Sequence, residues 1–295
     1  MSIILAGTAK KLPSWFKQEI PAGEAREVLE LLSVKGINTI CQEARCPNLN
    51  YCFKSGELTF LILGRRCSRN CLFCAVNKKQ EVVFGIDELE PGRIAAIVET
   101  LALKYVVVTS VTRDDLVDGG AGQFKRTMES IHSLGRRVRI EVLIPDFKGS
   151  PDSLKTVIAG SPVVIGHNIE TVPRLYRQLK PDCDHSVSLK VLSMIKEIDP
   201  LIITKSSLML GLGEKEDEVI ESLEGLRGAG CDIITLGQYL SPGEAHYPVK
   251  EFINPQKFHS YGKTAKALGF KAVMSGALVR SSYQAEKLYE EAKYA

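Results

Sequence analysis

The 295-residue sequence lacks several features that would direct it to a membrane, to nucleic acid or to export. It has no apolar run of 18 or more residues, so no membrane-spanning helix is expected. Its net charge is only +3, from 38 basic and 35 acidic residues, which gives no general attraction to nucleic acid or anionic lipid. The start, Met1 to Gly7, has no charged leader and too short an apolar stretch for a secretory signal. We therefore expect a cytoplasmic protein with neither nucleic acid nor membrane as a partner.

Histidine is also scarce, whereas cysteine is concentrated in one region. None of the five histidines lies near that region in the sequence. Six of the eight cysteines form two triplets, and clustered cysteines in a reducing compartment bind metal more often than they form disulfides. The first triplet, with spacing C-x4-C-x5-C, is Cys41, Cys46 and Cys52; the second, with spacing C-x3-C-x2-C, is Cys67, Cys71 and Cys74.

Three ligands in each triplet favour iron–sulfur clusters over zinc. A structural zinc site is usually closed by four ligands, and six thiolates are an awkward number for one zinc ion. Three thiolates can hold a 4Fe–4S cube by three corners and leave one iron open. Zinc, or a redox role for Cys71 and Cys74, remains the alternative. The isolated Cys183 and Cys231 are expected to be small buried hydrophobic residues.

From residue 58 onward, apolar strand-like runs alternate with amphipathic helix-like segments. This pattern predicts an α/β fold with a parallel sheet covered by helices, although a doubly wound open sheet fits almost as well. Residues 1–57 and 276–295 are expected to be extensions of a unit at 58–275. The expected strands are 58–64, 105–111, 138–144, 163–169, 202–212 and 232–239, and the expected helices are 92–103, 124–134, 153–158, 187–198, 217–227 and 256–268.

The second triplet follows the first expected strand. In barrel-type α/β folds the loop after a strand opens onto the face where ligands bind, so a metal site is expected there. The basic residues Arg65, Arg66 and Arg69 beside it are expected on a solvated face or at a docking spot.

The second triplet, with the aromatic Phe73 before its last cysteine, resembles the cysteine motif of radical S-adenosylmethionine enzymes. The pairing of both triplets with RSSY near the C-terminal end resembles the lipoyl synthase family in particular, and the resemblance extends from about residue 13 to residue 290. The matching stretches are 41–48 (CQEARCPN) with Cys52, 107–116 (VVTSVTRDDL), 118–120 (DGG), 140–146 (IEVLIPD), 167–176 (HNIETVPRLY), 210–214 (LGLGE), 237–239 (GQY) and 280–283 (RSSY).

The resemblance implies a partial six-unit (β/α) TIM-type barrel and a sulfurtransferase. In radical enzymes of this kind, S-adenosylmethionine binds the open iron of a 4Fe–4S cluster and yields a 5′-deoxyadenosyl radical that removes hydrogen. The family inserts two sulfur atoms at C6 and C8 of an octanoyl chain on a lysine of a lipoyl carrier domain, with an auxiliary 4Fe–4S cluster as sulfur donor. The implied partners are the glycine-cleavage H protein or a dehydrogenase E2, a ferredoxin or flavodoxin reductant and an iron–sulfur carrier protein.

The resemblance also assigns roles to the cysteines and to one serine. Cys67, Cys71 and Cys74 hold the cluster that binds S-adenosylmethionine, and the first triplet holds the auxiliary cluster. The fourth ligand of the auxiliary cluster maps to Ser282, with Ser281 as the fallback. From the sequence alone, either serine could instead cap a helix at 284–293.

Several polar residues are candidates for binding S-adenosylmethionine. Asp118, Gly119 and Gly120 could admit its methionyl end, because glycine lets backbone approach a ligand closely, and an ordinary turn is the alternative. Asn168 and Glu170 could reach its ribose, and a structural hydrogen-bonded pair is the alternative. Lys205 and Arg174 could meet a carboxylate, and a surface role is the alternative for both. His167 could line the pocket, and a structural role in the core is the alternative.

Overall fold

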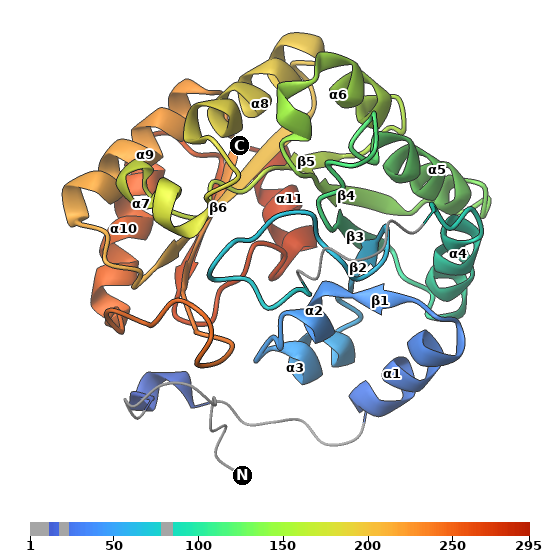
Figure 1. Cartoon of the computed structure of the whole chain (residues 1–295), viewed down its shortest axis with the longest axis horizontal. Coiled ribbons are helices and arrows are strands. Elements are labelled where there is room, and N and C mark those ends of the chain that lie inside the picture. Colours follow the sequence, from blue (N-terminus) through green and yellow to red (C-terminus); the bar gives the residue numbers. More distant parts are fainter. Residues whose placement is uncertain (1–11, 18–23, 78–84) are drawn as a thin grey trace.

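The computed structural model describes residues 12–17, 24–77 and 85–295, so Met1 to Gly7 lie outside the described residues. In these ranges the strands form one curved sheet of eight strands, an incomplete barrel with helices around its outer face (Figure 1). The strands follow chain order, without the reversal of order that defines a doubly wound sheet. The α/β fold with a parallel, barrel-like sheet is therefore confirmed.

The first strand runs antiparallel to the second, and the others are parallel. The strands are β1 (Asn38–Thr39), β2 (Thr59–Ile62), β3 (Tyr105–Ser110), β4 (Arg139–Leu143), β5 (Val164–Gly166), β6 (Ile203–Leu210), β7 (Ile233–Gln238) and β8 (Ala272–Gly276). The sequence predicts β2 to β7 but not β1 or β8, so the sheet has two strands more than expected.

Most of the expected helices are present, with further helices at both ends of the chain. The helices on the barrel are α4 (Glu90–Thr100), α5 (Ala121–His132), α6 (Pro151–Ile158), α7 (Pro173–Leu179), α8 (His185–Ile198), α9 (Glu216–Gly228) and α10 (Pro255–Ala267). The terminal segments contribute α1 (Glu24–Val34), α2 (Ile40–Glu43), α3 (Leu49–Lys54) and α11 (Ala285–Lys293), and two short 3₁₀ helices are η1 (Ser14–Phe16) and η2 (Phe147–Gly149). No helix in the described ranges is long and apolar enough to cross a membrane.

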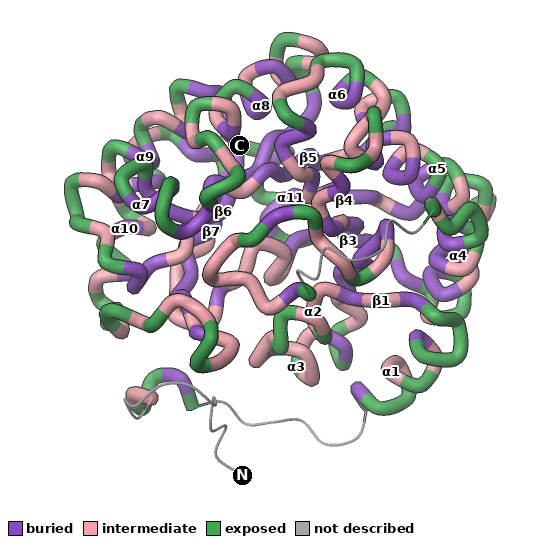
Figure 2. Tube along the Cα trace, viewed as in Figure 1, coloured by how far each residue is buried: buried purple, intermediate pink, exposed green. Residues whose placement is uncertain are grey.

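The two terminal segments pack into the same cores as the sheet. Leu32 of α1 and Phe53 of α3 join the large core between β2 and the helices outside it. Leu288 and Tyr289 of α11 pack on the inner face of the sheet against Tyr105, where β3 begins. Helix α11 thus fills the end of the barrel at which the parallel strands begin, and the strands around it are largely buried (Figure 2). The division of the chain at residues 57 and 275 stays a prediction.

Candidate active site

The second cysteine triplet lies on the loop that follows β2 and crosses the open end of the barrel (Figure 1). The loop is held by backbone hydrogen bonds: the amide of Cys67 donates to the carbonyl of Asn77 at 3.0 Å, and that of Leu72 to the carbonyl of Leu179 at 2.9 Å. Its three cysteines are partly exposed, and none is in a disulfide. Three thiols that are not in disulfides therefore lie at the end of the barrel where α/β barrels bind ligands.

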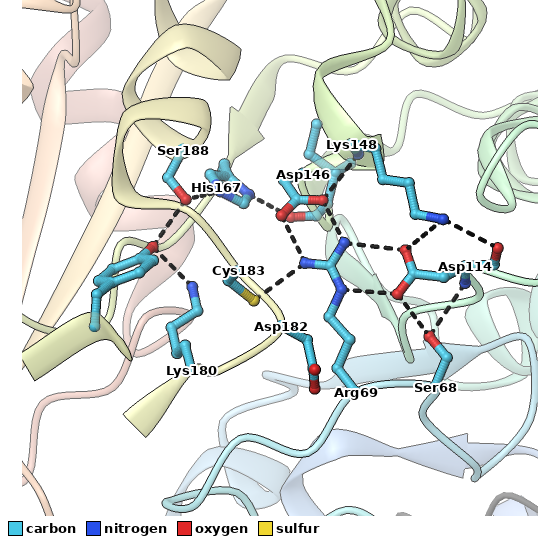
Figure 3. A network of polar contacts seen from close by, with 12 residues as sticks. Ser68, Arg69, Asp114, Asp146, Lys148, His167, Lys180, Asp182, Cys183 and Ser188 are labelled. Carbon is cyan, nitrogen blue, oxygen red and sulfur yellow. Dashed lines mark hydrogen bonds and ion pairs between the residues drawn. The ribbon is translucent and has the colours of Figure 1, made fainter. Parts of the chain in front are cut away.

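Arg69, between the first two cysteines of this loop, fastens it to the barrel. Its guanidinium donates to both carboxylate oxygens of Asp114, at 2.8 and 3.0 Å, and to both of Asp146, at 2.6 and 2.7 Å (Figure 3). The side chain is only 7% exposed. The expectation that Arg69 lies on a solvated face is therefore wrong. Two bidentate ion pairs to the residues after β3 and β4 hold the loop in one place.

Cys183 lies beside the same loop, which corrects its expected role as an isolated buried residue. It is partly exposed, and Arg69 Nη1 donates to its Sγ at 3.1 Å. A hydrogen bond from the Cys71 thiol, together with the charges of Lys180 and Arg69, lowers the pKa of Cys183 to about 6 against the effect of burial. Cys231, by contrast, is fully buried as expected, and burial raises the pKa of its thiol to about 12.

The first cysteine triplet lines a cavity of about 290 Å³ between the N-terminal segment, β2, β3 and the C-terminal segment. Cys41 lies on α2, Cys46 after it, and Cys52 on α3, where the Cys52 amide donates to the Asn48 carbonyl at 2.9 Å. Asn48 also donates to the carbonyl of Leu278 at 2.6 Å, which ties the triplet to the C-terminal segment. Burial raises the pKa of the Cys41 thiol to about 12. All three thiols therefore share one cavity.

Ser282 lines this cavity with the three cysteines, and Ser281 is not among the residues that line it. The Ser282 hydroxyl accepts a hydrogen bond from Thr59 Oγ1 at 2.9 Å, which fixes it beside the start of β2. Helix α11 is capped by Gln284, at a φ of 48°, without a side-chain hydrogen bond. The alternative in which Ser281 or Ser282 caps this helix is therefore wrong.

Among the polar groups that line the cavity are three thiols and the Ser282 hydroxyl, a set that fits a cluster held by three cysteines and one further ligand. Within the described ranges, no group of three or more histidine, cysteine, aspartate or glutamate side chains is arranged to hold a metal ion. The assignment of a cluster to each triplet therefore stays a prediction.

The turn at residues 118–120 is explained by the backbone around it. The carboxylate of Asp118 accepts hydrogen bonds from the amides of Gly120 at 2.9 Å and Gly122 at 2.7 Å, at the start of α5. Gly119 and Gly120 have φ of 62° and 92°, and a Cβ on Gly120 would lie 2.2 Å from Leu63 Cδ1. The glycines are thus needed for the turn, and their contact with S-adenosylmethionine stays a prediction.

Asn168 and Glu170 come together just after β5. The amide of Asn168 donates to Glu170 Oε1 at 3.0 Å, and burial raises the pKa of the Glu170 carboxyl. The structural hydrogen-bonded pair, which was the alternative to ribose binding, is therefore present. Binding of ribose by the same two side chains stays a prediction.

The remaining polar candidates all have protein partners. His167 is buried, with Nδ1 2.9 Å from the Ile144 carbonyl and Nε2 3.0 Å from Ser188 Oγ, and burial lowers its pKa to about 4. Lys205 does meet a carboxylate, but it is that of Glu141, at 2.8 Å inside the barrel, and so its expected surface role is wrong. Arg174 is half exposed and pairs with Glu218, which confirms its surface role.

Comparison with known proteins identifies the family. The family profile described as "Radical SAM superfamily" matches residues 61–226. Lipoyl synthase from Caldicellulosiruptor bescii is 51% identical over 277 residues, which cover 94% of each chain. The chain belongs to the lipoyl synthase family of radical S-adenosylmethionine enzymes. Lipoyl synthase from Caldanaerobacter subterraneus subsp. tengcongensis is also similar, at 47% identity over 93% of this chain and 95% of that one.

Solved structures support the fold at much lower identity. Methylornithine synthase (PylB) superposes with a TM-score of 0.57 at 15% identity, over 80% of this chain and 69% of that one. The FeFe-hydrogenase maturase HydG from Carboxydothermus hydrogenoformans gives 0.58 at 13%, over 91% and 68%. Family membership places the chain in lipoyl cofactor biosynthesis, with S-adenosylmethionine and a 4Fe–4S cluster as its cofactors.

Proposed function

We propose that the protein inserts two sulfur atoms at C6 and C8 of an octanoyl chain on a lysine of a lipoyl carrier domain. The observation that carries this proposal is the cavity in which Cys41, Cys46, Cys52 and Ser282 meet, in a chain whose second triplet crosses the open end of the barrel. The triplet at the open end of the barrel would by itself account only for a cluster that generates the radical. The separate set of donors in the cavity provides a place for a cluster that serves as the sulfur source.

The residues of the two sites have distinct tasks in this proposal. When bound, the two 4Fe–4S clusters and S-adenosylmethionine supply the hydrogen-abstracting radical and the sulfur atoms. Cys67, Cys71 and Cys74 hold the cluster at the open end, and Arg69 keeps their loop in place. The first triplet and Ser282 hold the auxiliary cluster. A hydroxyl is a harder ligand than a thiol, and so among these four side chains Ser282 would bind the iron of a cluster least tightly.

Arg280 supports the cavity with positive charge. Its guanidinium donates to the carbonyl of Val279 at 2.7 Å and to that of Gln238 at 3.3 Å, which places the cation on the lining of the cavity. Burial lowers the pKa of Arg280, and the nearby Cys46 acts against that shift. A cation at this position stabilises the negative charge of thiolate ligands.

The partners follow from the substrate and the cofactors. The octanoyl group arrives on a lipoyl carrier domain, either the glycine-cleavage H protein or a dehydrogenase E2. A ferredoxin or flavodoxin reduces the cluster at the second triplet, and an iron–sulfur carrier protein restores the auxiliary cluster after turnover.

An anaerobic turnover assay tests the proposal. The protein, with both clusters reconstituted, is supplied with an octanoylated carrier peptide, S-adenosylmethionine and a strong reductant, and the mass of the peptide is followed. We expect the peptide to gain two sulfur atoms without a net loss of hydrogen, because the strong reductant keeps the inserted sulfur atoms as two thiols. A peptide without sulfur, from protein that contains about eight irons per chain, would contradict the proposal.

A further inference from the structure

Glu57 is an acidic residue on the lining of the cavity that contains the first cysteine triplet. Helix α3 ends at Lys54, and the chain then turns back through Gly56, whose φ of 72° is a conformation that glycine adopts readily. The turn returns the chain to the triplet, because the backbone amide of Glu57 donates to the carbonyl of Cys52 at 2.8 Å. The backbone therefore holds Glu57 beside a cysteine of the triplet.

The carboxylate of Glu57 bridges two walls of the cavity. It accepts a hydrogen bond from the Cys52 thiol on the wall formed by the N-terminal segment. Its Oε2 accepts a second hydrogen bond, at 3.3 Å, from the amide of Gln284, two residues after Ser282 in the C-terminal segment. One carboxylate thus contacts both a cysteine of the triplet and the segment that carries Ser282.

Within the described ranges, no basic side chain forms an ion pair with Glu57, although it is half-buried. The other acidic residue of the lining, Glu286, is exposed and pairs with Arg139 at 3.1 Å. Of the two cations on the lining, Arg280 donates to backbone carbonyls and Lys104 is exposed. Taking a carboxylate out of water is costly unless an opposite charge or strong hydrogen bonds compensate it. Glu57 is therefore an anion without a cation, in a cavity lined by thiols.

We propose that Glu57 is an alternative iron ligand in this cavity, which binds the iron of the auxiliary cluster that Ser282 holds whenever the serine leaves it. Once Cys52 binds iron it has lost its thiol proton, and the Glu57 carboxylate then keeps only the Gln284 amide as a donor. A carboxylate oxygen, like a hydroxyl, is a hard donor that ferrous iron accepts. In the exchange the bond from iron to the serine oxygen breaks, a bond from iron to the carboxylate forms, and the serine oxygen takes a proton from water. This inference rests on the proposed function.

The iron content of anaerobically reconstituted variants tests the inference without turnover. In Ser282→Ala the carboxylate of Glu57 should replace the serine, so this variant should keep about eight irons per chain, like the wild type. In the double variant Ser282→Ala/Glu57→Gln neither oxygen ligand remains. We expect that variant to lose one iron, to about seven per chain, and to show the electron paramagnetic resonance spectrum of a 3Fe–4S cluster. Glu57→Gln alone should keep all its iron, since Ser282 is present.

Two matched double variants separate a ligand from a structural role. Ser282→Ala/Glu286→Gln removes the charge of the other acidic residue of the lining and should lose no iron, because Glu286 is paired with Arg139. Ser282→Ala/Glu57→Asp keeps a carboxylate in the cavity and should recover part of the iron that the glutamine variant loses. Thermal unfolding of each cluster-free protein is measured as well, and Glu57→Gln should match the wild type, since glutamine can still accept from the Gln284 amide.

The outcomes distinguish this inference from the proposed function. Loss of iron in Ser282→Ala itself, or the same iron content with and without Glu57→Gln in that background, would overturn the role of Glu57 and leave the proposed function in place. An equal loss in the Glu286→Gln control would do the same. A reconstituted wild-type protein that takes up only about four irons per chain would overturn both.

Discussion

Arg69 Nη1 and Nη2 bond the two carboxylate oxygens of Asp146 at 2.6 and 2.7 Å, across 77 residues of sequence. This relationship places the cysteine loop against the end of β4. Because Arg69 and Asp146 are 7% and 6% exposed, neither charge can be left to solvent when its partner is removed.

Replacement of this arginine should therefore destabilise the protein strongly. In Arg69→Ala the carboxylate of Asp146 is left buried without its partner, and the free energy of unfolding of the cluster-free protein should fall by about 3–5 kcal/mol in urea titrations. The matched control is Arg26→Ala, which breaks an exposed pair with Glu30 on α1 and should cost less than about 1 kcal/mol. Equal effects of the two variants would show that Arg69 does not anchor the loop.

The buried imidazole of His167 should make stability fall as the pH drops. Burial lowers its pKa from 6.5 to about 4, so below pH 6.5 the unfolded chain binds a proton that the folded protein does not. Stability should thus decrease by on the order of 3 kcal/mol between pH 6.5 and pH 4. Asp146 adds to this only at lower pH, since Arg69 outweighs burial and holds the pKa of that carboxyl at about 2. Urea titrations of the His167→Gln variant should show a smaller decrease in the free energy of unfolding between pH 6.5 and pH 4. An unchanged decrease would rule out His167 as its cause.

Ser282 and Ser281 should differ sharply on replacement. Ser282 lines the cavity of the first triplet and Ser281 does not. Ser282→Ala should lower sulfur insertion by at least about tenfold, while Ser281→Ala should stay near the wild-type rate. Both variants should still cleave S-adenosylmethionine to 5′-deoxyadenosine, since the second triplet is untouched. Ser282→Cys tests the weak-ligand argument separately, because intact sulfur insertion in that variant would show that a labile hydroxyl ligand is not needed.

Gly237 on β7 gives the C-terminal segment room to approach the sheet. A Cβ on this residue would lie 2.2 Å from the carbonyl oxygen of Val279, three residues before Ser282. Gly237→Ala should cost about 1–3 kcal/mol of stability and also reduce sulfur insertion, because the displaced segment carries Ser282. Gly228→Ala is the control, since a Cβ there has open space around it, and thermal unfolding should show little change.

Much of the barrel could be predicted from the sequence, because its central strands are short apolar runs. Strand β8 was missed because its residues, AVMSG, include a serine and a glycine and are mostly half-buried. Strand β1 has two residues and no pattern of its own. The helix α7 has seven residues, too few for its periodicity to be distinct.

In the candidate site, too, features that are local in the sequence could be predicted, whereas contacts between residues far apart in the sequence could not. The two cysteine triplets are local patterns, and their spacing favours iron–sulfur clusters without any knowledge of the fold, although the cluster that each triplet holds stays a prediction. The burial of Arg69 was not predictable, since its partners lie 45 and 77 residues away and meet it only because β3 and β4 are neighbours. The acidic residues that follow both strands, Asp114 and Asp146, were the one available sign. Cys183 likewise joins the site through the fold alone.

The most direct test of the account follows the sulfur from protein to product. The protein is reconstituted with sulfide of a heavy sulfur isotope and freed of excess sulfide, and the octanoylated peptide is then converted anaerobically in a single turnover. We predict that mass spectrometry will find heavy sulfur at both C6 and C8, and that a variant with the first triplet replaced by alanine will cleave S-adenosylmethionine but leave the peptide without sulfur. Product sulfur without the heavy isotope, or sulfur insertion by that variant, would contradict the account.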